Sequence, residues 1–326
     1  MSEDFYRIKR LPPYVFAEVN RLKADYRSKG VDIIDFGMGN PDMDTPHHIV
    51  EKLVQTVRKS RTHRYSSSKG INGLRKAQAR YYKNRFDVAL DPEREIIATL
   101  GSKEGLANLA MAITAPGDVM LVPNPSYPIH PYGFMIAGGT LRHLPTLHDG
   151  KFKPEEYMQS LSRAVAHSVP KPVALVVSFP SNPTAQLCDI DFYKELISFA
   201  KKNNLWILSD LAYAEIYFDG NPPPSILQVN GAKEVAVEFT SLSKTFSMPG
   251  WRMGFAVGNS RLIDALTRIK SYLDYGAFTP IQVAAATALN GETDCIASIR
   301  DTYKSRRNTL IDSMERIGWT IPSPPA

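Results

Sequence analysis

The chain has 326 residues, of which 43% are hydrophobic and 22% charged, and it carries a net charge of +6. This is ordinary globular composition, and no apolar run is long enough to span a membrane. The basic excess is spread along the chain without interleaved aromatic residues, so we expect no nucleic-acid partner.

Cysteine and histidine usage narrows the class further. The two cysteines, Cys188 and Cys295, form no disulfide framework, and the charged N-terminus lacks the apolar core of a secretory signal. We therefore expect a cytoplasmic protein without a membrane partner. The seven histidines show no metal-ligand spacing, so no metal site is predicted.

Short apolar runs alternate with helical patterns through the middle of the chain. Continuous apolar strands separated by helices indicate a mostly parallel central sheet that is covered on both faces, which is an α/β architecture. The predicted strands are 96–100, 119–122, 173–179, 205–208, 235–239 and 255–257, and the predicted helices are 70–82, 103–114, 189–202 and 260–272.

The two ends of the chain differ from this centre. Residues 1–46 hold a helical stretch followed by VDIIDFGMGNPD, and residues 281–317 are typical of two helices with a break near Asn290 and Gly291. We predict that the N-terminal arm, 1–46, and the C-terminal segment, 281–326, contribute to a small domain beside a large domain at 47–280. Trp319 to Ile321 is typical of the start of a strand, and we expect the small domain to be incomplete.

Polar segments follow the predicted strands, at the sheet edge where open α/β folds bind ligands. In GSKEG, Ser102 and the backbone of Lys103 could hold a phosphate at a helix start, or Ser102 could cap that helix. In NPSYP, Tyr127 could lie against a planar ring or belong to a surface turn. In SNPT, Asn182 could direct its amide to a ring oxygen, although Asn-Pro turns are common.

The segment SDLAYAE follows the strand at 205–208. A carboxylate there is costly unless it is paired, so Asp210 could face a protonated pyridine nitrogen, or it could cap a helix. Tyr213, three residues on, could donate to an oxygen on the same ring. Near the N-terminus, GMGNPD lacks the third glycine of a dinucleotide motif, and we interpret Gly39 as a turn that lets a substrate carboxylate approach.

The segment TSLSKTFSMPGWRMG, residues 240–254, surrounds Lys244 with hydroxyl side chains. A sheltered lysine is a good amine nucleophile because burial disfavours its charged form. Ser241, Ser243 and Arg252 suit a phosphate. The segment could therefore hold a phosphorylated carbonyl compound as a Schiff base, or it could be a polar loop with one exposed lysine.

Taken together, these segments resemble the class I/II aminotransferases of the pyridoxal-phosphate fold type I superfamily. The matching stretches cover nearly the whole chain and are FGMGNPD, RYSSSKGINGLRKA, LGSKEG, PNPSYP, SFPSNPT, SDLAYAE and SLSKTFSMPGWRMG. RLPPYVF, GSKEGLANL, PSNPTAQ and KSYLDYGAFTPIQ are similar to bacterial glutamate–pyruvate (alanine) aminotransferases, and LL-diaminopimelate aminotransferases share much of that pattern.

The resemblance implies pyridoxal 5′-phosphate as the cofactor, with Lys244 as its covalent attachment and as the group that moves the substrate's α-proton. Asp210 would keep the ring nitrogen protonated, while Tyr213 and Asn182 would bind the ring oxygen. Tyr65 would reach the phosphate of the neighbouring subunit, which implies a homodimer with shared active sites. The other implied contacts are Tyr127 on the ring, Ser102, Lys103, Ser241, Ser243 and Arg252 on the phosphate, and Tyr14, Gly39 and Asn182 on the substrate.

The implied reaction is ping-pong transfer of an amino group from an L-amino acid, with alanine as the first candidate, to 2-oxoglutarate, giving pyruvate and glutamate. Transamination of LL-diaminopimelate or another amino acid is the alternative, and a pyridoxal-phosphate lyase of the same fold is a third. Chains of this family continue past the equivalent of Ala326, and that tail supplies an arginine for the substrate carboxylate. A truncated, cofactor-binding but inactive chain is therefore the alternative from another class.

Overall fold

The computed structural model describes residues 5–35, 37 and 39–326; Phe36 and Met38 of the motif FGMGNPD lie outside the described residues. Over the described residues, seven strands form one sheet in the order β1-β7-β6-β5-β4-β2-β3. Neighbouring strands are parallel except at β7, which is antiparallel to both β1 and β6, so the predicted mostly parallel sheet is confirmed. The strands are β1 (Ile96–Thr99), β2 (Val119–Asn124), β3 (Thr140–Pro145), β4 (Pro172–Ser178), β5 (Trp206–Asp210), β6 (Ala236–Ser241) and β7 (Gly254–Gly258).

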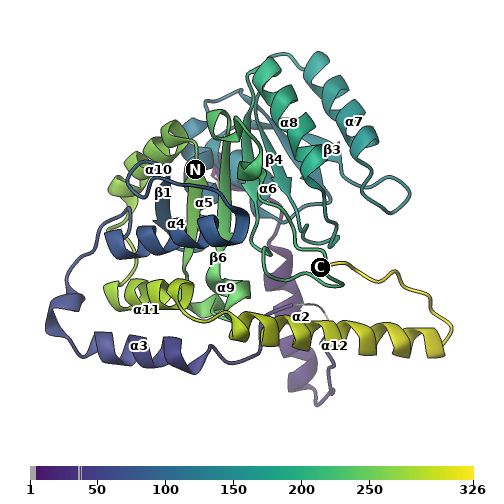
Figure 1. Ribbon diagram of the computed structural model, residues 1–326. Coiled ribbons are helices and arrows are strands. Elements are labelled where there is room, and N and C mark those ends of the chain that lie inside the picture. Colours follow the sequence, from purple (N-terminus) through teal and green to yellow (C-terminus); the bar gives the residue numbers. More distant parts are fainter. Residues whose placement is uncertain (1–4, 36, 38) are drawn as a thin grey trace.

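Helices cover both faces of the sheet (Figure 1). One face packs against α4 (Asn72–Phe86), α7 (Pro154–Ala166) and α8 (Ile190–Asn203), and the other against α5 (Ser102–Ile113), α6 (Ile129–Ala137) and α10 (Ser260–Leu273). Successive strand residues alternate between the two cores: Ile96 belongs to the first and Ile97 to the second. Burial on both faces explains why these strands are continuous apolar runs.

The ends of the chain supply further helices. The N-terminal ones are α1 (Tyr6–Lys9), α2 (Val15–Ser28) and α3 (His47–Val57), and α2 has no buried residue. Near the C-terminus, α11 (Thr279–Asn290) packs against α3 and α4, and α12 (Asp294–Arg316) follows it, so the predicted break near Asn290 is confirmed. The remaining short elements are α9 (Leu242–Thr245), η1 (Ser60–His63), η2 (Ile226–Gln228), η3 (Ala232–Glu234) and η4 (Pro249–Trp251).

The segment from Trp319 to Ile321 was predicted to start a strand, and that prediction is wrong: residues 319–326 have no regular secondary structure. A strand needs a neighbouring strand to pair with, and prolines, which are frequent in this segment, lack the N–H donor for pairing. The segment instead runs back from the end of α12 toward the sheet (Figure 1), where the Phe218 N–H donates to the Pro325 carbonyl at 2.7 Å.

The division of the chain into an N-terminal arm at 1–46, a large domain at 47–280 and a C-terminal segment at 281–326 stays a prediction. In the described part of the chain, none of the helices combines the length and the apolar character needed to cross a bilayer.

Candidate active site

The predicted site segments meet at one edge of the sheet. The parallel strands β2, β4, β5 and β6 direct their carboxyl ends to this edge, and β1 has the same direction. Because β7 is antiparallel, its amino end lies there too, which brings Arg252 beside residues that precede it by about half the chain. The topology therefore gathers segments that are far apart in sequence.

Asp210 ends β5 and is only 6% exposed. It lies two residues after Leu208 and so points to the face covered by α5, α6 and α10. On that face its Oδ2 lies 2.9 Å from Nε2 of His130 in α6, while its Oδ1 accepts the Ala212 N–H at 3.2 Å. Asp210 is thus paired in a buried place with a histidine and a backbone donor.

His130, which is 1% exposed, was not among the predicted site residues. It lies three residues after Tyr127, in the first turn of α6, where its N–H donates to the Tyr127 carbonyl at 3.0 Å. Their rings meet edge-on, with centroids 6.0 Å apart and planes at 74°. Nδ1 of His130 has no hydrogen-bond partner among the described residues.

Tyr213 and Asn182 lie side by side above Asp210. The Asn182 amide donates to the Tyr213 hydroxyl at 3.3 Å. Burial, assisted by the negative charge of Asp210, raises the pKa of Tyr213 to about 12. This phenol therefore stays protonated at neutral pH and can donate a hydrogen bond.

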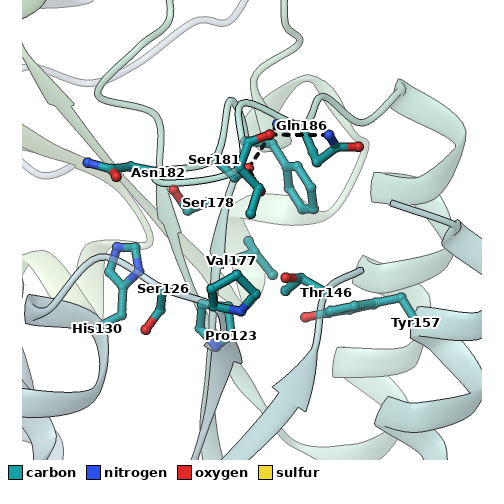
Figure 2. A pocket seen from close by; sticks show the side chains of 13 residues that line it. Pro123, Ser126, His130, Thr146, Tyr157, Val177, Ser178, Ser181, Asn182 and Gln186 are labelled. Carbon is teal, nitrogen blue, oxygen red and sulfur yellow. Dashed lines mark hydrogen bonds between the residues drawn. The ribbon is translucent and has the colours of Figure 1, made fainter. Parts of the chain in front are cut away.

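Asn182 and His130 also border a small cavity between the ends of β2 and β4 (Figure 2). Tyr157 and Val177 also line it, and the Tyr157 hydroxyl is buried without a hydrogen-bond partner in the described structure. The cavity is an extension of the site rather than a second one.

Lys244 lies in the short helix α9, between buried Ser243 and Thr245. Its Nζ is 5.9 Å from the centre of the Tyr213 ring. Burial, and after it the positive charge of Arg252, lowers the pKa of Lys244. A larger fraction of this amine is therefore neutral, and so nucleophilic, at neutral pH.

An anion-binding cradle lies where β1 ends and α5 begins. Gly101 has φ of +83°, and a Cβ there would lie 2.3 Å from Nη2 of Arg252. The guanidinium is fixed by bonds from Nη1 to the Pro249 carbonyl, 2.8 Å, and from Nη2 to the Leu100 carbonyl, 3.3 Å. The N–H groups in the first turn of α5 have no acceptor within the helix, so they and Arg252 suit a phosphate.

Ser241 and Ser243 belong to the same cradle. Ser241 is paired with Gly254 across β6 and β7, and a Cβ on Gly254 would lie 2.7 Å from the backbone nitrogen of Ser102. The Ser241 hydroxyl accepts the Ser243 N–H at 3.1 Å, which caps α9. The structure thus brings together all the residues that were predicted to contact the phosphate within one subunit.

The side chains of Lys103, Tyr127 and Tyr14 lie close together. Nζ of Lys103 lies 6.0 Å from the ring centre of Tyr127 and 5.6 Å from that of Tyr14. The predicted phosphate contact is the backbone of Lys103. The side chain of Lys103 lies near these two rings. Gly39 is exposed, with open space where a side chain would be.

Tyr65 is not part of this cluster as far as the described residues show. It is 86% exposed, and its ring lies 4.6 Å from that of Tyr275, which is 63% exposed. Both rings face outward from the subunit.

This fold and this site define a known class. The chain belongs to the class I and II aminotransferases, because the sequence model of that family matches residues 31–326. It is therefore an aminotransferase, and the enzymes of this class and fold depend on pyridoxal phosphate.

Several named proteins are similar to the chain over nearly all of its length. AatC of Rhizobium meliloti (strain 1021), named as an aminotransferase, is 63% identical over 99% of this chain and 79% of its own length. The glutamate-pyruvate aminotransferase AlaC of Escherichia coli (strain K12) is 51% identical over 99% of this chain and 77% of its own. An LL-diaminopimelate aminotransferase of Halothermothrix orenii is 41% identical over 98% and 81%.

The fold is similar to that of solved structures. A substrate-bound structure of BacF from Bacillus subtilis superimposes with a TM-score of 0.91 at 33% identity, over 99% of this chain and 81% of that one.

The residues present fit the cofactor on local grounds. A side chain at position 101 would displace the Arg252 guanidinium, so the cradle depends on Gly101. The donors of the cradle suit a phosphate. Asp210, buried at the edge, can pair with a protonated ring nitrogen, and the Tyr213 phenol can donate to a ring oxygen. Among residues 5–35, 37 and 39–326, no group of three His, Cys, Asp or Glu side chains could hold a metal ion.

Proposed function

We propose that this chain transfers the amino group of L-alanine to 2-oxoglutarate, giving pyruvate and glutamate by a ping-pong mechanism. The observation that carries the reaction type is Lys244, a half-buried amine with a lowered pKa beside Tyr213 and Arg252. The choice of alanine is supported by the 51% identity to an enzyme named glutamate-pyruvate aminotransferase. LL-diaminopimelate is the second candidate, supported by the 41% identity to an enzyme named for that substrate.

Lys244 is the proposed catalytic base and acid. Bound pyridoxal phosphate supplies a carbonyl carbon for the amino group and a ring that withdraws electrons from the substrate's α-carbon. The neutral Nζ of Lys244 would take the proton from that α-carbon as a base and then, as an acid, give it to the carbon that was the cofactor's carbonyl carbon. The lowered pKa increases the fraction of this amine that is neutral and can accept a proton.

Asp210 and His130 form the proposed support for the ring nitrogen. The Asp210 carboxylate would hold a proton on that nitrogen, since a buried anion favours a cation at contact distance. His130 fixes the orientation of the carboxylate through the 2.9 Å contact. Tyr213 and Asn182 are the proposed donors to the ring oxygen, and Tyr127 is the proposed ring contact.

The cradle holds the phosphate in this proposal. Its contacts are the Ser102 side chain, the backbone of Lys103, the hydroxyls of Ser241 and Ser243, and the guanidinium of Arg252. Tyr14, Gly39 and Asn182 are the proposed substrate contacts.

We propose a homodimer in which each subunit lends Tyr65 to the other's phosphate. The support is that large hydrophobic side chains are exposed along the N-terminal arm and beside Tyr65, as expected for surfaces that a second copy covers. These are Phe5, Ile8, Tyr14, Val15, Leu22 and Tyr26 on the arm, and Tyr272, Leu273, Tyr275 and Phe278 in the segment whose Tyr275 ring contacts Tyr65. A cytoplasmic location is proposed with it, because Cys188 and Cys295 are both free thiols.

One experiment tests this function. The purified protein is saturated with pyridoxal phosphate, its visible absorption is recorded, and L-alanine is added while pyruvate is measured. Bleaching of the band with release of pyruvate is the expected result, and Lys244→Ala should lose turnover by at least about 10⁴-fold. LL-diaminopimelate reacting in place of alanine would select the second substrate. A band that no amino acid changes would identify a cofactor-binding, inactive chain.

A further inference from the structure

A lysine outside the proposed catalytic set is fully buried between two carboxylates. Lys270 of α10 is 0% exposed, and its Nζ contacts Oε1 of Glu104 at 2.7 Å and Oδ2 of Asp274 at 2.8 Å. Burying an ammonium group is costly, and lysine is rarely fully buried unless it is paired. Each carboxylate is hydrogen-bonded to a different part of the molecule.

Glu104 leads to the phosphate cradle. It lies in the first turn of α5, and its Oε2 accepts the Leu100 N–H at 2.9 Å. The carbonyl of the same Leu100 accepts Nη2 of Arg252. The charge on Lys270 therefore holds the carboxylate that shapes the turn on which the cradle depends.

Asp274 leads to the segment that presents Tyr65. Its Oδ1 accepts the Gly276 N–H at 2.6 Å, and its carbonyl accepts the Ser68 hydroxyl. Gly276 has φ of +79°, and a Cβ there would lie 2.2 Å from the Ser67 carbonyl, so the two segments lie in close contact. Between Asp274 and Gly276, Tyr275 contacts Tyr65 with the ring planes tilted by 39°.

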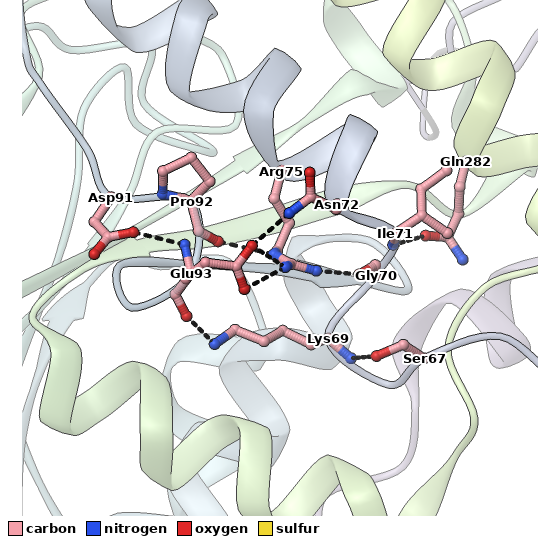
Figure 3. A network of polar contacts seen from close by, with 10 residues as sticks. All are labelled: Ser67, Lys69, Gly70, Ile71, Asn72, Arg75, Asp91, Pro92, Glu93 and Gln282. Atoms are coloured by element: carbon pink, nitrogen blue, oxygen red, sulfur yellow. Dashed lines mark hydrogen bonds and ion pairs between the residues drawn. The ribbon is translucent and has the colours of Figure 1, made fainter.

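The other end of the Tyr65 segment is fixed separately. Arg75 pairs with both carboxylate oxygens of Glu93 at 2.7 Å and donates to the Gly70 carbonyl (Figure 3). Gln282 accepts the Ile71 N–H at 2.8 Å from the opposite side (Figure 3). Gln282 Nε2 also donates to the Ser66 hydroxyl at 2.8 Å. The position of Tyr65 therefore depends both on this bond to its neighbour and on its ring contact with the segment that Asp274 fixes.

We propose that Lys270 is a positioning residue for phosphate contacts in two different active sites. It aligns the cradle of its own subunit through Glu104, and it aligns the Tyr65 that this subunit lends to its partner through Asp274. The inference rests on the proposed function, in particular on the sharing of sites in a dimer. Since Lys270 acts only on phosphate contacts, loss of its charge weakens recognition of the phosphate and spares recognition of the pyridine ring.

The test compares two probes that differ only in the phosphate, pyridoxal phosphate and pyridoxal. Their dissociation constants are measured by visible absorption on the full-length, cofactor-free protein. In Lys270→Met we expect affinity for pyridoxal phosphate to fall about tenfold, as for loss of a charged hydrogen bond, with affinity for pyridoxal little changed. Lys270→Arg should restore most of the preference for pyridoxal phosphate over pyridoxal. Lys233→Met is the matched control, because it removes a lysine that pairs with Glu95 at 3.0 Å at the amino edge of the sheet.

Two milder variants keep the test decisive if Lys270→Met does not fold. Glu104→Gln and Asp274→Asn each remove one charge and retain an acceptor, and both should lower the preference for the phosphorylated probe. Tyr65→Phe can be combined with Lys270→Met or with Asp274→Asn. Each double variant should lose less affinity for pyridoxal phosphate than the product of the two single losses, because Lys270 and Asp274 act partly through Tyr65.

The outcomes separate the inference from the proposed function. A wild-type protein that does not prefer pyridoxal phosphate to pyridoxal would overturn both. A wild-type protein with a clear preference that the Lys270, Glu104 and Asp274 variants all retain would overturn the role of Lys270 alone. Equal losses for the two probes would show a general structural role and would also overturn it.

Discussion

Two buried carboxylates on neighbouring strands have opposite surroundings. Asp210 of β5 pairs in register with Phe239 of β6, and Glu238 of β6 pairs with Ser209 of β5, so the two acids are one residue apart and face opposite sides of the sheet. Glu238 is 0% exposed and accepts from the Tyr82 hydroxyl at 2.9 Å, the Ser209 hydroxyl and the Ile226 N–H at 3.1 Å each, and the Ser225 hydroxyl.

The difference lies in what remains available to a ligand. Four donors occupy Glu238, and although they act to lower its pKa, burial outweighs them and raises it. Asp210 accepts from one histidine and one N–H and lies at the edge of the sheet, where a further cation can reach it. Burial of an acid is common to both, whereas incomplete pairing at a strand end distinguishes the functional one.

The largest expected effect comes from Asp210→Asn. The amide keeps the size of the side chain and loses the charge that would hold a proton on the ring nitrogen. We expect kcat to fall by about 10²–10³, the range for loss of one preorganised electrostatic contact. The thermal unfolding midpoint of the cofactor-free protein should change little, and a variant with near wild-type kcat would remove Asp210 from the proposed mechanism.

Glu238→Gln should lower stability and leave kcat nearly unchanged, the reverse of Asp210→Asn. The new amide turns two donors toward a site in which the Ile226 N–H can only donate and three hydroxyls are oriented to donate to the carboxylate. The free energy of unfolding should therefore fall by about 1–3 kcal/mol, the cost of an unsatisfied buried group. Urea unfolding measures this change. Turnover per folded molecule should stay near the wild-type value, and a large loss of kcat without loss of stability would contradict the comparison.

His130→Phe tests the side-chain partner that the described residues supply to Asp210. The phenyl ring fills the volume but leaves Oδ2 without its 2.9 Å contact. Turnover should fall about tenfold, as for loss of a hydrogen bond to a charged group. His130→Gln, which can restore a donor, serves as the control. If both variants lose equal activity, shape rather than the hydrogen bond is what matters.

The smallest expected effect concerns pH. Arg252 helps to lower the pKa of Lys244, and a lowered pKa raises the neutral fraction of an amine at every pH below its ordinary value. In cofactor-free Arg252→Gln, acylation of Lys244 at pH 8, followed by mass spectrometry, should therefore slow severalfold. Its pH dependence should shift upward, because the neutral amine forms at higher pH. An unchanged profile would assign the lowered pKa to burial alone.

Local patterns could predict the central sheet because most of its strands are buried on both faces and appear as apolar runs. The strand β3 was missed for the same reason: most of its residues are exposed or half-buried, and only Leu144 is buried. The family motifs gave the residues of the cradle. His130 could not be found in this way, because it is a single histidine whose partner lies 80 residues away in the chain.

The antiparallel strand β7 has a consequence for how the protein is made. Leu100 and Arg252, which meet in the cradle, are 152 residues apart in the chain, and contacts at such separation form late because a long loop must close first. A chain still on the ribosome has made the first six strands of the sheet before the second half of the phosphate cradle exists. Cofactor capture is therefore tied to near-completion of the sheet, and no fragment that stops before β7 can be rescued by adding pyridoxal phosphate.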